Sequence, residues 1–283
     1  MHHNHEMAYE ITDPKLARRT VLDLASQVDF IKCIYDGDPG TPEKLPLPVL
    51  QAIVAAAHEM GKKVLVHVKT GTDLVEAVEA GADGIEHTFL PRDPADLSEA
   101  EAIAALLART GTYFCPTLVT WEQIGRGGDR TYLDELAQDE IISANEVSEI
   151  AARPFFNRPF PHHPADESLA RFHYGMQIMP ILRDAGVKIV AGSDVALSMS
   201  LPRALLRELQ LLAKAGLPNH DVIIAATRHA AEKIGQGANT ATITAGAVAD
   251  AVLLNANPLI DIMHLIRPAH RVATIQHGHL VAR

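Results

Sequence analysis

The sequence is poor in cysteine, in aromatic residues and in positive charge. Only two cysteines, Cys33 and Cys115, occur among 283 residues, and both lie in apolar runs. This scarcity excludes a disulfide framework and predicts buried thiols in a reducing compartment, so we expect a cytoplasmic protein. The 35 acidic residues outnumber the 25 Lys and Arg residues, which gives a formal net charge of −10 without any basic cluster. We therefore expect neither nucleic acid nor an anionic membrane as a partner.

Long hydrophobic runs are also lacking. No apolar stretch approaches the roughly 18 residues that a membrane-spanning helix needs, and residues 1–7 carry no apolar segment of the kind found in signal peptides. The chain is nevertheless 47% hydrophobic over 283 residues. A chain of this kind can bury a large core, as one α/β domain with an appendage or as two domains.

The stretch from 63 to 90 organises the rest of the chain. Residues 64–68 predict a buried strand, a helix follows, and residues 84–87 predict a second strand, so the stretch reads as a βαβ unit. Each strand ends in a histidine, His67 or His87. Because neighbouring parallel strands lie about 4.8 Å apart, two side chains at their C-terminal ends can converge on one point. Ligands bind at that edge of α/β sheets.

Two further polar residues occur in matching positions. Lys32 lies inside the apolar run 29–35, where an ammonium group must find a partner, be modified, or reach out along its stem to solvent. Asp194 follows the predicted strand 187–191 after a Gly-Ser turn. Each residue alone also has an ordinary structural interpretation. Either histidine can be a hydrogen-bonded core or rim residue, Lys32 can have a solvated head group, and Asp194 can cap a turn.

The predicted strands begin near residues 29, 63, 84, 113 and 187, and a helix follows each of them. The fourth of these strands is predicted over 113–119. Right-handed crossovers place such strands in order as parallel neighbours, which brings Lys32, His67, His87 and Asp194 to one rim. Two imidazoles, a carboxylate and a modifiable lysine suit a zinc-like ion with an open coordination position. From residue 241 short strands alternate with turns, so we predict an α/β portion over 1–240 and a small β segment over 241–283.

The ordered motifs resemble the amidohydrolase superfamily, nearest to its imidazolonepropionase-like and Xaa-Pro-dipeptidase-like branch. The motifs are, in order, FIK, VLVHV, GIEHT, CPTL, VAGSD, ATRHAAEKIG and TITAGAVADAVLLNANPL. The resemblance implies a (β/α)8 barrel with a small composite β-sandwich, of which about five βα units, strands four to eight, are present. The family's first strand supplies a metal-binding H-x-H pair, and no counterpart of it is found. His3 and His5 have this spacing but lie where the strand-three loop is expected.

The resemblance also implies roles for the four rim residues. Lys32 corresponds to the carbamylated lysine that bridges two metal ions, His67 and His87 to the ligands of strands five and six, and Asp194 to the aspartate that binds metal and shuttles the proton. The implied function is a metal-dependent hydrolase that cleaves the C–N bond of an amide, cyclic amide or dipeptide by attack of metal-bound hydroxide. Zinc is the expected metal, as one or two ions. By position only, the candidate substrate contacts are Tyr35, Asp36, Thr117 and Trp121.

Two other interpretations remain open at this stage. The chain could be a catalytically incomplete fragment or a non-catalytic remnant that needs a partner or an upstream segment. A second alternative is an aldolase that uses Lys32 as a Schiff base, although that chemistry gives no reason for His67, His87 and Asp194. A sheet that lacks its neighbouring strands is expected to associate through its edges, so a homo-oligomer is also considered.

Overall fold

The computed structural model describes five stretches of the chain, which are residues 9–37, 44–157, 163–194, 201–237 and 239–282. The contacts within these stretches divide the chain into two compact units. Unit 1 comprises residues 1–116, 181–189 and 233–235, and unit 2 comprises residues 117–180, 190–232 and 236–283. Both units are therefore built from segments that are distant in the sequence. The pair His3 and His5 lies outside the described residues.

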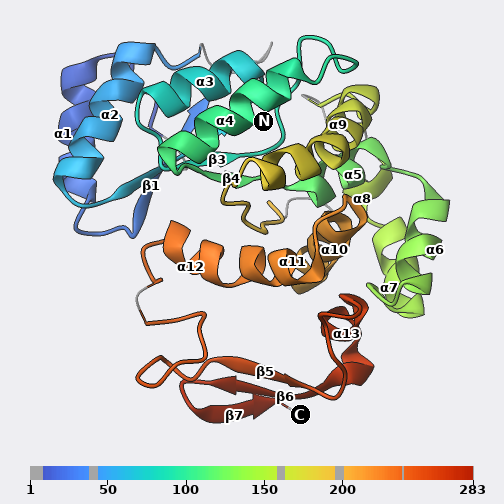
Figure 1. The fold of residues 1–283 in the computed structure, drawn as a ribbon. Helices are drawn as coiled ribbons and strands as arrows, with labels where there is room; N and C mark the ends of the chain where they lie inside the picture. Colours follow the sequence, from blue (N-terminus) through green and yellow to red (C-terminus); the bar gives the residue numbers. More distant parts are fainter. Residues whose placement is uncertain (1–8, 38–43, 158–162, 195–200, 238, 283) are drawn as a thin grey trace. The chain divides into compact units, whose positions relative to one another are not determined.

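Unit 1 contains a parallel sheet whose strands follow the order β1-β2-β3-β4 (Figure 1). The strands are β1 (Phe30–Tyr35), β2 (Lys63–Val68), β3 (Gly84–Glu86) and β4 (Tyr113–Cys115). The helices are α1 (Pro14–Leu24), α2 (Leu47–Glu59), α3 (Gly71–Glu79) and α4 (Ser98–Thr110), and they lie along one face of the sheet (Figure 1). The predicted α/β fold with sequential parallel neighbours is confirmed. The predicted fifth strand is reduced to one bridge, in which Ile189 pairs with Phe114.

Local sequence signals explain the βαβ unit. Thr70 caps α3, because its hydroxyl accepts a hydrogen bond from the Asp73 amide and the Asp73 carboxylate accepts one from the Thr70 amide. This capping box satisfies amide groups that the first turn of a helix leaves without partners. Leu74, Ala77 and Val78 are buried on one side of the helix. The cap and the apolar stripe together return the chain to the start of β3.

The edge strand β1 alternates between buried and exposed side chains. Cys33 and Tyr35 are buried, whereas Phe30, Lys32 and Ile34 are exposed. Among the described residues β1 pairs with β2 alone, so it is an edge strand, and its successive side chains point to opposite faces of the sheet. The expectation that Lys32 lies inside a buried strand is therefore wrong. An apolar run indicates a strand without revealing which of its faces is covered.

Unit 2 consists of helices and a small antiparallel sheet, in the order β5-β6-β7. The helices are α5 (Leu118–Gly125), α6 (Arg130–Gln138), α7 (Ala144–Ala151), α8 (Pro154–Asn157), α9 (Ala165–Asp184), α10 (Leu201–Lys214), α11 (Asn219–Ala226), α12 (Arg228–Lys233), α13 (Met263–Ile266) and the 3-10 turn η1 (Pro268–His270), with the ends of α9 and α12 belonging to unit 1. The strands are β5 (Ala251–Leu254), β6 (Arg271–Gln276) and β7 (His279–Ala282). The small β segment is confirmed, and a domain boundary at residue 240 stays a prediction.

The strand predicted over 113–119 ends early. Strand β4 stops at Cys115, and α5 begins at Leu118 after Thr117, whose φ of 48° is left-handed. Pro116 cannot donate a ladder hydrogen bond, and the buried carboxylate of Glu208 accepts the Val119 amide at 2.8 Å. This tertiary cap favours a helix where the apolar sequence alone favours a strand.

Buried charges join α5 to α10, which lie side by side in unit 2 (Figure 1). Arg207 donates from Nε and Nη2 to the two oxygens of Glu122, at 2.9 and 2.5 Å, and both residues are almost fully buried. Tyr132 donates to the same carboxylate at 3.1 Å. A buried ion pair needs such additional hydrogen bonds to offset its loss of hydration.

Both cysteines are free and buried, as predicted. Burial raises the pKa of the Cys33 thiol to about 12, so this thiol stays protonated and unreactive at neutral pH. Within the part of the chain that the structure describes, none of the helices combines the length and the apolar composition required to cross a bilayer.

The exposed face of β1 predicts self-association. Ile34 is 46% exposed on an edge strand, and an apolar edge is a template for pairing with another strand. We expect concentration-dependent association in light scattering after gel filtration, weakened several-fold by Ile34→Lys. Leu16→Lys is the matched control, because Leu16 is 43% exposed on a helix. A monomer at all concentrations would contradict this expectation.

The buried Glu208 predicts a pH-dependent stability. Burial raises the pKa of Glu208 from 4.5 to about 8, against hydrogen bonds from the Val119 and Leu118 amides that lower it. Because the raised pKa means that folding favours the protonated form, stability is full below about pH 4.5 and falls as the pH rises through 8.

Glu208→Gln removes this titration. Relative to the wild type, we expect the variant's free energy of unfolding to gain roughly 2 to 5 kcal/mol between pH 5 and pH 8.5, measured by urea unfolding. Glu149→Gln, at an exposed helical position, should leave the wild-type pH dependence unchanged. Parallel curves for the wild type and Glu208→Gln would contradict the expectation.

Candidate metal centre

His67 lies near the C-terminal end of β2 and has a fixed ring. In the parallel register it stands beside Ile34 of β1. Its Nε2 lies 2.7 Å from Oδ2 of Asp36, which follows the last residue of β1 and is 7% exposed. This contact leaves Nδ1 as the ring nitrogen for coordination. A carboxylate that holds the second nitrogen of an imidazole is the usual support of a metal-binding histidine.

His87 follows the last residue of β3 and has an unusual backbone. Its φ is 78°, in the left-handed region that only a small share of non-glycine residues adopt. Its amide donates to the Cys115 carbonyl at 2.8 Å. Its buried ring lies 4.5 Å from that of His67, measured between centroids, at an interplanar angle of 66°. The structure thus brings two imidazoles together at the C-terminal edge of the sheet.

Two other charged residues share the sheet face of His67. Lys32 pairs in register with Leu65, so it lies one pleat, or about 6.6 Å, before the level of His67 on the adjacent strand. Glu86 stands directly beside His67 on β3, but its carboxylate forms an ion pair of 2.5 Å with the buried Lys233. The acidic neighbour is therefore held by a lysine.

A zinc ion takes three protein ligands in a catalytic site. The described residues contain no group of three or more His, Cys, Asp or Glu side chains arranged for a metal. His67 and His87 supply two imidazoles, and the Asp36–His67 contact is a supporting shell. The chemistry of these donors fits zinc, and a third donor must come from Lys32 in a carbamylated form or from outside unit 1.

Tyr35 and Asp36, expected as substrate contacts, have structural partners. The Tyr35 hydroxyl donates to Glu76 at 2.7 Å, and Lys44 Nζ lies 4.1 Å from the centre of its ring. Burial, followed by this hydrogen bond, raises the pKa of Tyr35 to about 12. Asp36 orients His67, a role that sequence reasoning missed. Its position directly after a strand was the available signal.

Asp194, Thr117 and Trp121 belong to unit 2, so the predicted meeting of all four rim residues stays a prediction. Asp194 has a left-handed φ of 38°. Thr117 is buried and precedes α5. Trp121 is 2% exposed on α5, and the guanidinium of Arg171 lies 3.9 Å from the centre of its ring.

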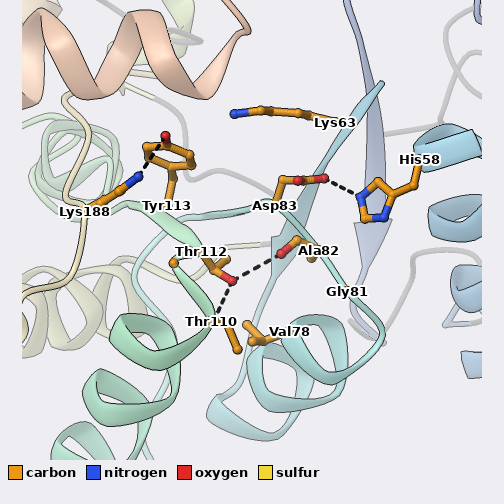
Figure 2. Close-up of a pocket in the computed structure, with 11 residues that line it drawn as sticks. His58, Lys63, Val78, Gly81, Ala82, Asp83, Thr110, Thr112, Tyr113 and Lys188 are labelled. Atoms are coloured by element: carbon orange, nitrogen blue, oxygen red, sulfur yellow. Dashed lines mark hydrogen bonds and ion pairs between the residues drawn. The ribbon is translucent and has the colours of Figure 1, made fainter. Parts of the chain in front are cut away.

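A pocket of about 620 Å³ lies at the other end of the unit 1 sheet (Figure 2). It is lined by residues at the strand starts, among them Lys63 and Tyr113, and by Lys188. His58 Nε2 forms a hydrogen bond of 2.8 Å with Oδ2 of Asp83 at its wall (Figure 2). This pair resembles the His67–Asp36 contact but stands at the opposite strand ends, away from the paired imidazoles.

The chain belongs to the amidohydrolase family, whose model matches residues 31–281. The family predicted from the ordered motifs is thereby confirmed. A search of curated proteins found no match.

Solved structures share the fold. A prolidase complexed with N-methylphosphonate-L-proline is 25% identical, with a TM-score of 0.71, and the match covers 98% of this chain and 60% of that one. An Xaa-Pro dipeptidase with bound methionine is 21% identical, with a TM-score of 0.70 and coverages of 96% and 59%. The A. niger ochratoxinase is 22% identical, with a TM-score of 0.67 and coverages of 95% and 55%. This chain therefore spans less than two thirds of these solved chains.

The geometry predicts which histidines contribute to metal binding. We expect His67→Ala to lower zinc affinity at least about 100-fold and Asp36→Asn to lower it about 10- to 100-fold, because the ring loses its orienting partner. Competition with a chromogenic chelator measures both affinities. His58→Ala is the matched control, since His58 has a similar Asp contact at the opposite strand ends. Equal affinities of the wild type and His67→Ala would remove His67 from the site.

Proposed function

We propose that this chain belongs to a metal-dependent amidohydrolase that cleaves the C–N bond of an amide, a cyclic amide or a dipeptide. The observation that carries the proposal is the pair of imidazoles at the C-terminal edge of the sheet, with His67 held by Asp36. Membership of the amidohydrolase family supports the same reaction class. Because this chain spans about three fifths of the solved prolidase, the activity of the whole protein is part of the proposal.

His67, His87 and a carbamylated Lys32 would hold the metal, which we propose to be zinc. When bound, such an ion supplies Lewis acidity and lowers the pKa of a water molecule. Asp36 keeps the His67 ring in one orientation through Nε2. The carboxylate of Asp194 accepts a proton from the attacking water and delivers it to the nitrogen of the leaving amine.

Dipeptides with C-terminal proline are the first substrate class in this proposal. It is supported by the 25% identical prolidase, whose bound molecule is a proline derivative. An Xaa-Pro dipeptidase shares the fold. Cyclic amides and N-acyl amino acids are tested beside the dipeptides, because loops set specificity in barrel enzymes.

The second candidate is a chain that becomes catalytic only with additional barrel strands. Two observations favour it. Lys32 is exposed on an edge strand, and the described residues bring together only two imidazoles as metal ligands. The two candidates share the family and differ in whether the chain alone turns over substrate.

An activity assay separates these candidates. With zinc or manganese added, we expect amine release from Xaa-Pro dipeptides to stop on chelation and to return when metal is restored. Asp194→Asn should lower kcat about 100- to 10,000-fold, the usual contribution of a general acid–base group, while His58→Ala keeps the wild-type rate. Activity that resists chelation, or persists in Asp194→Asn, would refute the metal-dependent mechanism. Zinc binding without turnover would favour the second candidate.

A further inference from the structure

The turn that carries Asp194 is fastened from a neighbouring helix of unit 2. The Thr120 hydroxyl on α5 lies 2.6 Å from the Ser193 carbonyl oxygen and 3.2 Å from that of Asp194. A hydroxyl has one proton to donate, so the two carbonyls share it, with the shorter contact at Ser193. Just before the turn, the Ala191 amide donates to the Ala225 carbonyl at 3.1 Å.

Thr120 differs from two threonines at the C-terminal ends of helices, which are Thr110, the last residue of α4, and Thr227, directly after α11. Thr110 and Thr227 each donate to the carbonyl four positions earlier, that of Leu106 at 3.0 Å and that of Ile223 at 2.6 Å. Such back-bonding is the usual choice of a threonine hydroxyl in a helix. Thr120 lies in the first turn of α5, so the residue four positions earlier, Pro116, precedes the helix. Its hydroxyl is therefore directed to another segment.

The position of Thr120 is itself fixed. Glu208, fully buried on α10, accepts the neighbouring Val119 amide at 2.8 Å and so holds the first turn of α5. One turn later on α5, the buried Glu122 accepts two hydrogen bonds from the guanidinium of Arg207, which also lies on α10. Thr120 is only 6% exposed. The hydroxyl thus reaches Asp194 from a rigid support.

Asp194 needs such support because of its backbone. Its φ of 38° lies in the left-handed region, which costs energy for a residue with a Cβ and persists only when the surroundings hold it. The carbonyls of Ser193 and Asp194 flank the Asp194 peptide and Cα. Fixing both carbonyls restricts the direction in which the carboxylate leaves the backbone.

We infer that Thr120 is a positioning residue for Asp194, acting through the Ser193 and Asp194 carbonyls. The inference rests on the proposed function, because it gives Asp194 the proton transfer. Thr120 touches neither substrate nor metal in this scheme. Loss of its hydroxyl misdirects the carboxylate and lowers the rate of proton transfer while substrate binding is kept.

Thr120→Val removes the hydroxyl at nearly constant volume, and Thr120→Ser restores it. We expect Thr120→Val to lower kcat about 10- to 100-fold with KM within about two-fold, the scale of a small misplacement of a reacting group. The pH dependence of kcat should shift in Thr120→Val and return to the wild-type profile in Thr120→Ser. Thr227→Val is the control, because it also removes a threonine hydroxyl bonded to a carbonyl.

A second measurement needs no activity. Amide resonances of Ser193 and Asp194 in a proton–nitrogen correlation spectrum should move in Thr120→Val and hold their wild-type positions in Thr120→Ser and Thr227→Val. Unchanged resonances in Thr120→Val, or a kcat equal to that of Thr227→Val, would overturn the inference. An Asp194→Asn variant with wild-type activity would instead overturn the proposed function, so the two failures are distinguishable.

Discussion

The parallel register of β1 to β4 is the constraint on which the candidate site depends. Because each strand runs in the same direction and begins at nearly the same level, the C-terminal ends meet at one edge of the sheet. Asp36, His67 and His87 reach that edge from three consecutive units although up to 51 positions separate them in the sequence. A shift of β2 by one residue would turn His67 toward the helices and place Val66 or Val68 beside Asp36.

In unit 2, α5 begins only three residues after the end of β4, and a residue from another helix stabilises its first turn. Thr117 supplies a left-handed turn but no side-chain cap, so the buried carboxylate of Glu208 takes the place of the missing cap. This carboxyl group of Glu208 is fully buried, and burial raises its pKa to about 8. The hydrogen bond between Glu208 and the Val119 amide fixes the first turn of α5 against α10.

The sequence predicted the parallel order and the meeting of His67 with His87, because strand spacing and the crossover rule depend on local signals. It failed at Lys32, because an apolar run does not reveal which face of a strand is covered. It also extended β4 into residues 118 and 119, because the competing helix is stabilised by Glu208, about 90 positions away. Asp36 escaped notice as the partner of His67 because a hydrogen bond between neighbouring strand ends leaves no periodic pattern in the sequence.

The interleaving of the two units has a consequence for synthesis. The bridge from Phe114 to Ile189 and the ion pair from Glu86 to Lys233 join strands β3 and β4 to later segments of unit 1, which leave the ribosome much later. Strands β1 to β4 can pair as they emerge, since their contacts are local. The ion pair of Glu86 forms only after Lys233, 147 residues later in the sequence, has been synthesised. Contacts of such long sequence separation form slowly, because the entropy of loop closure must be overcome first. A nascent chain halted near residue 180 would therefore display a sheet with an uncompensated carboxylate beside His67, a natural target for chaperones.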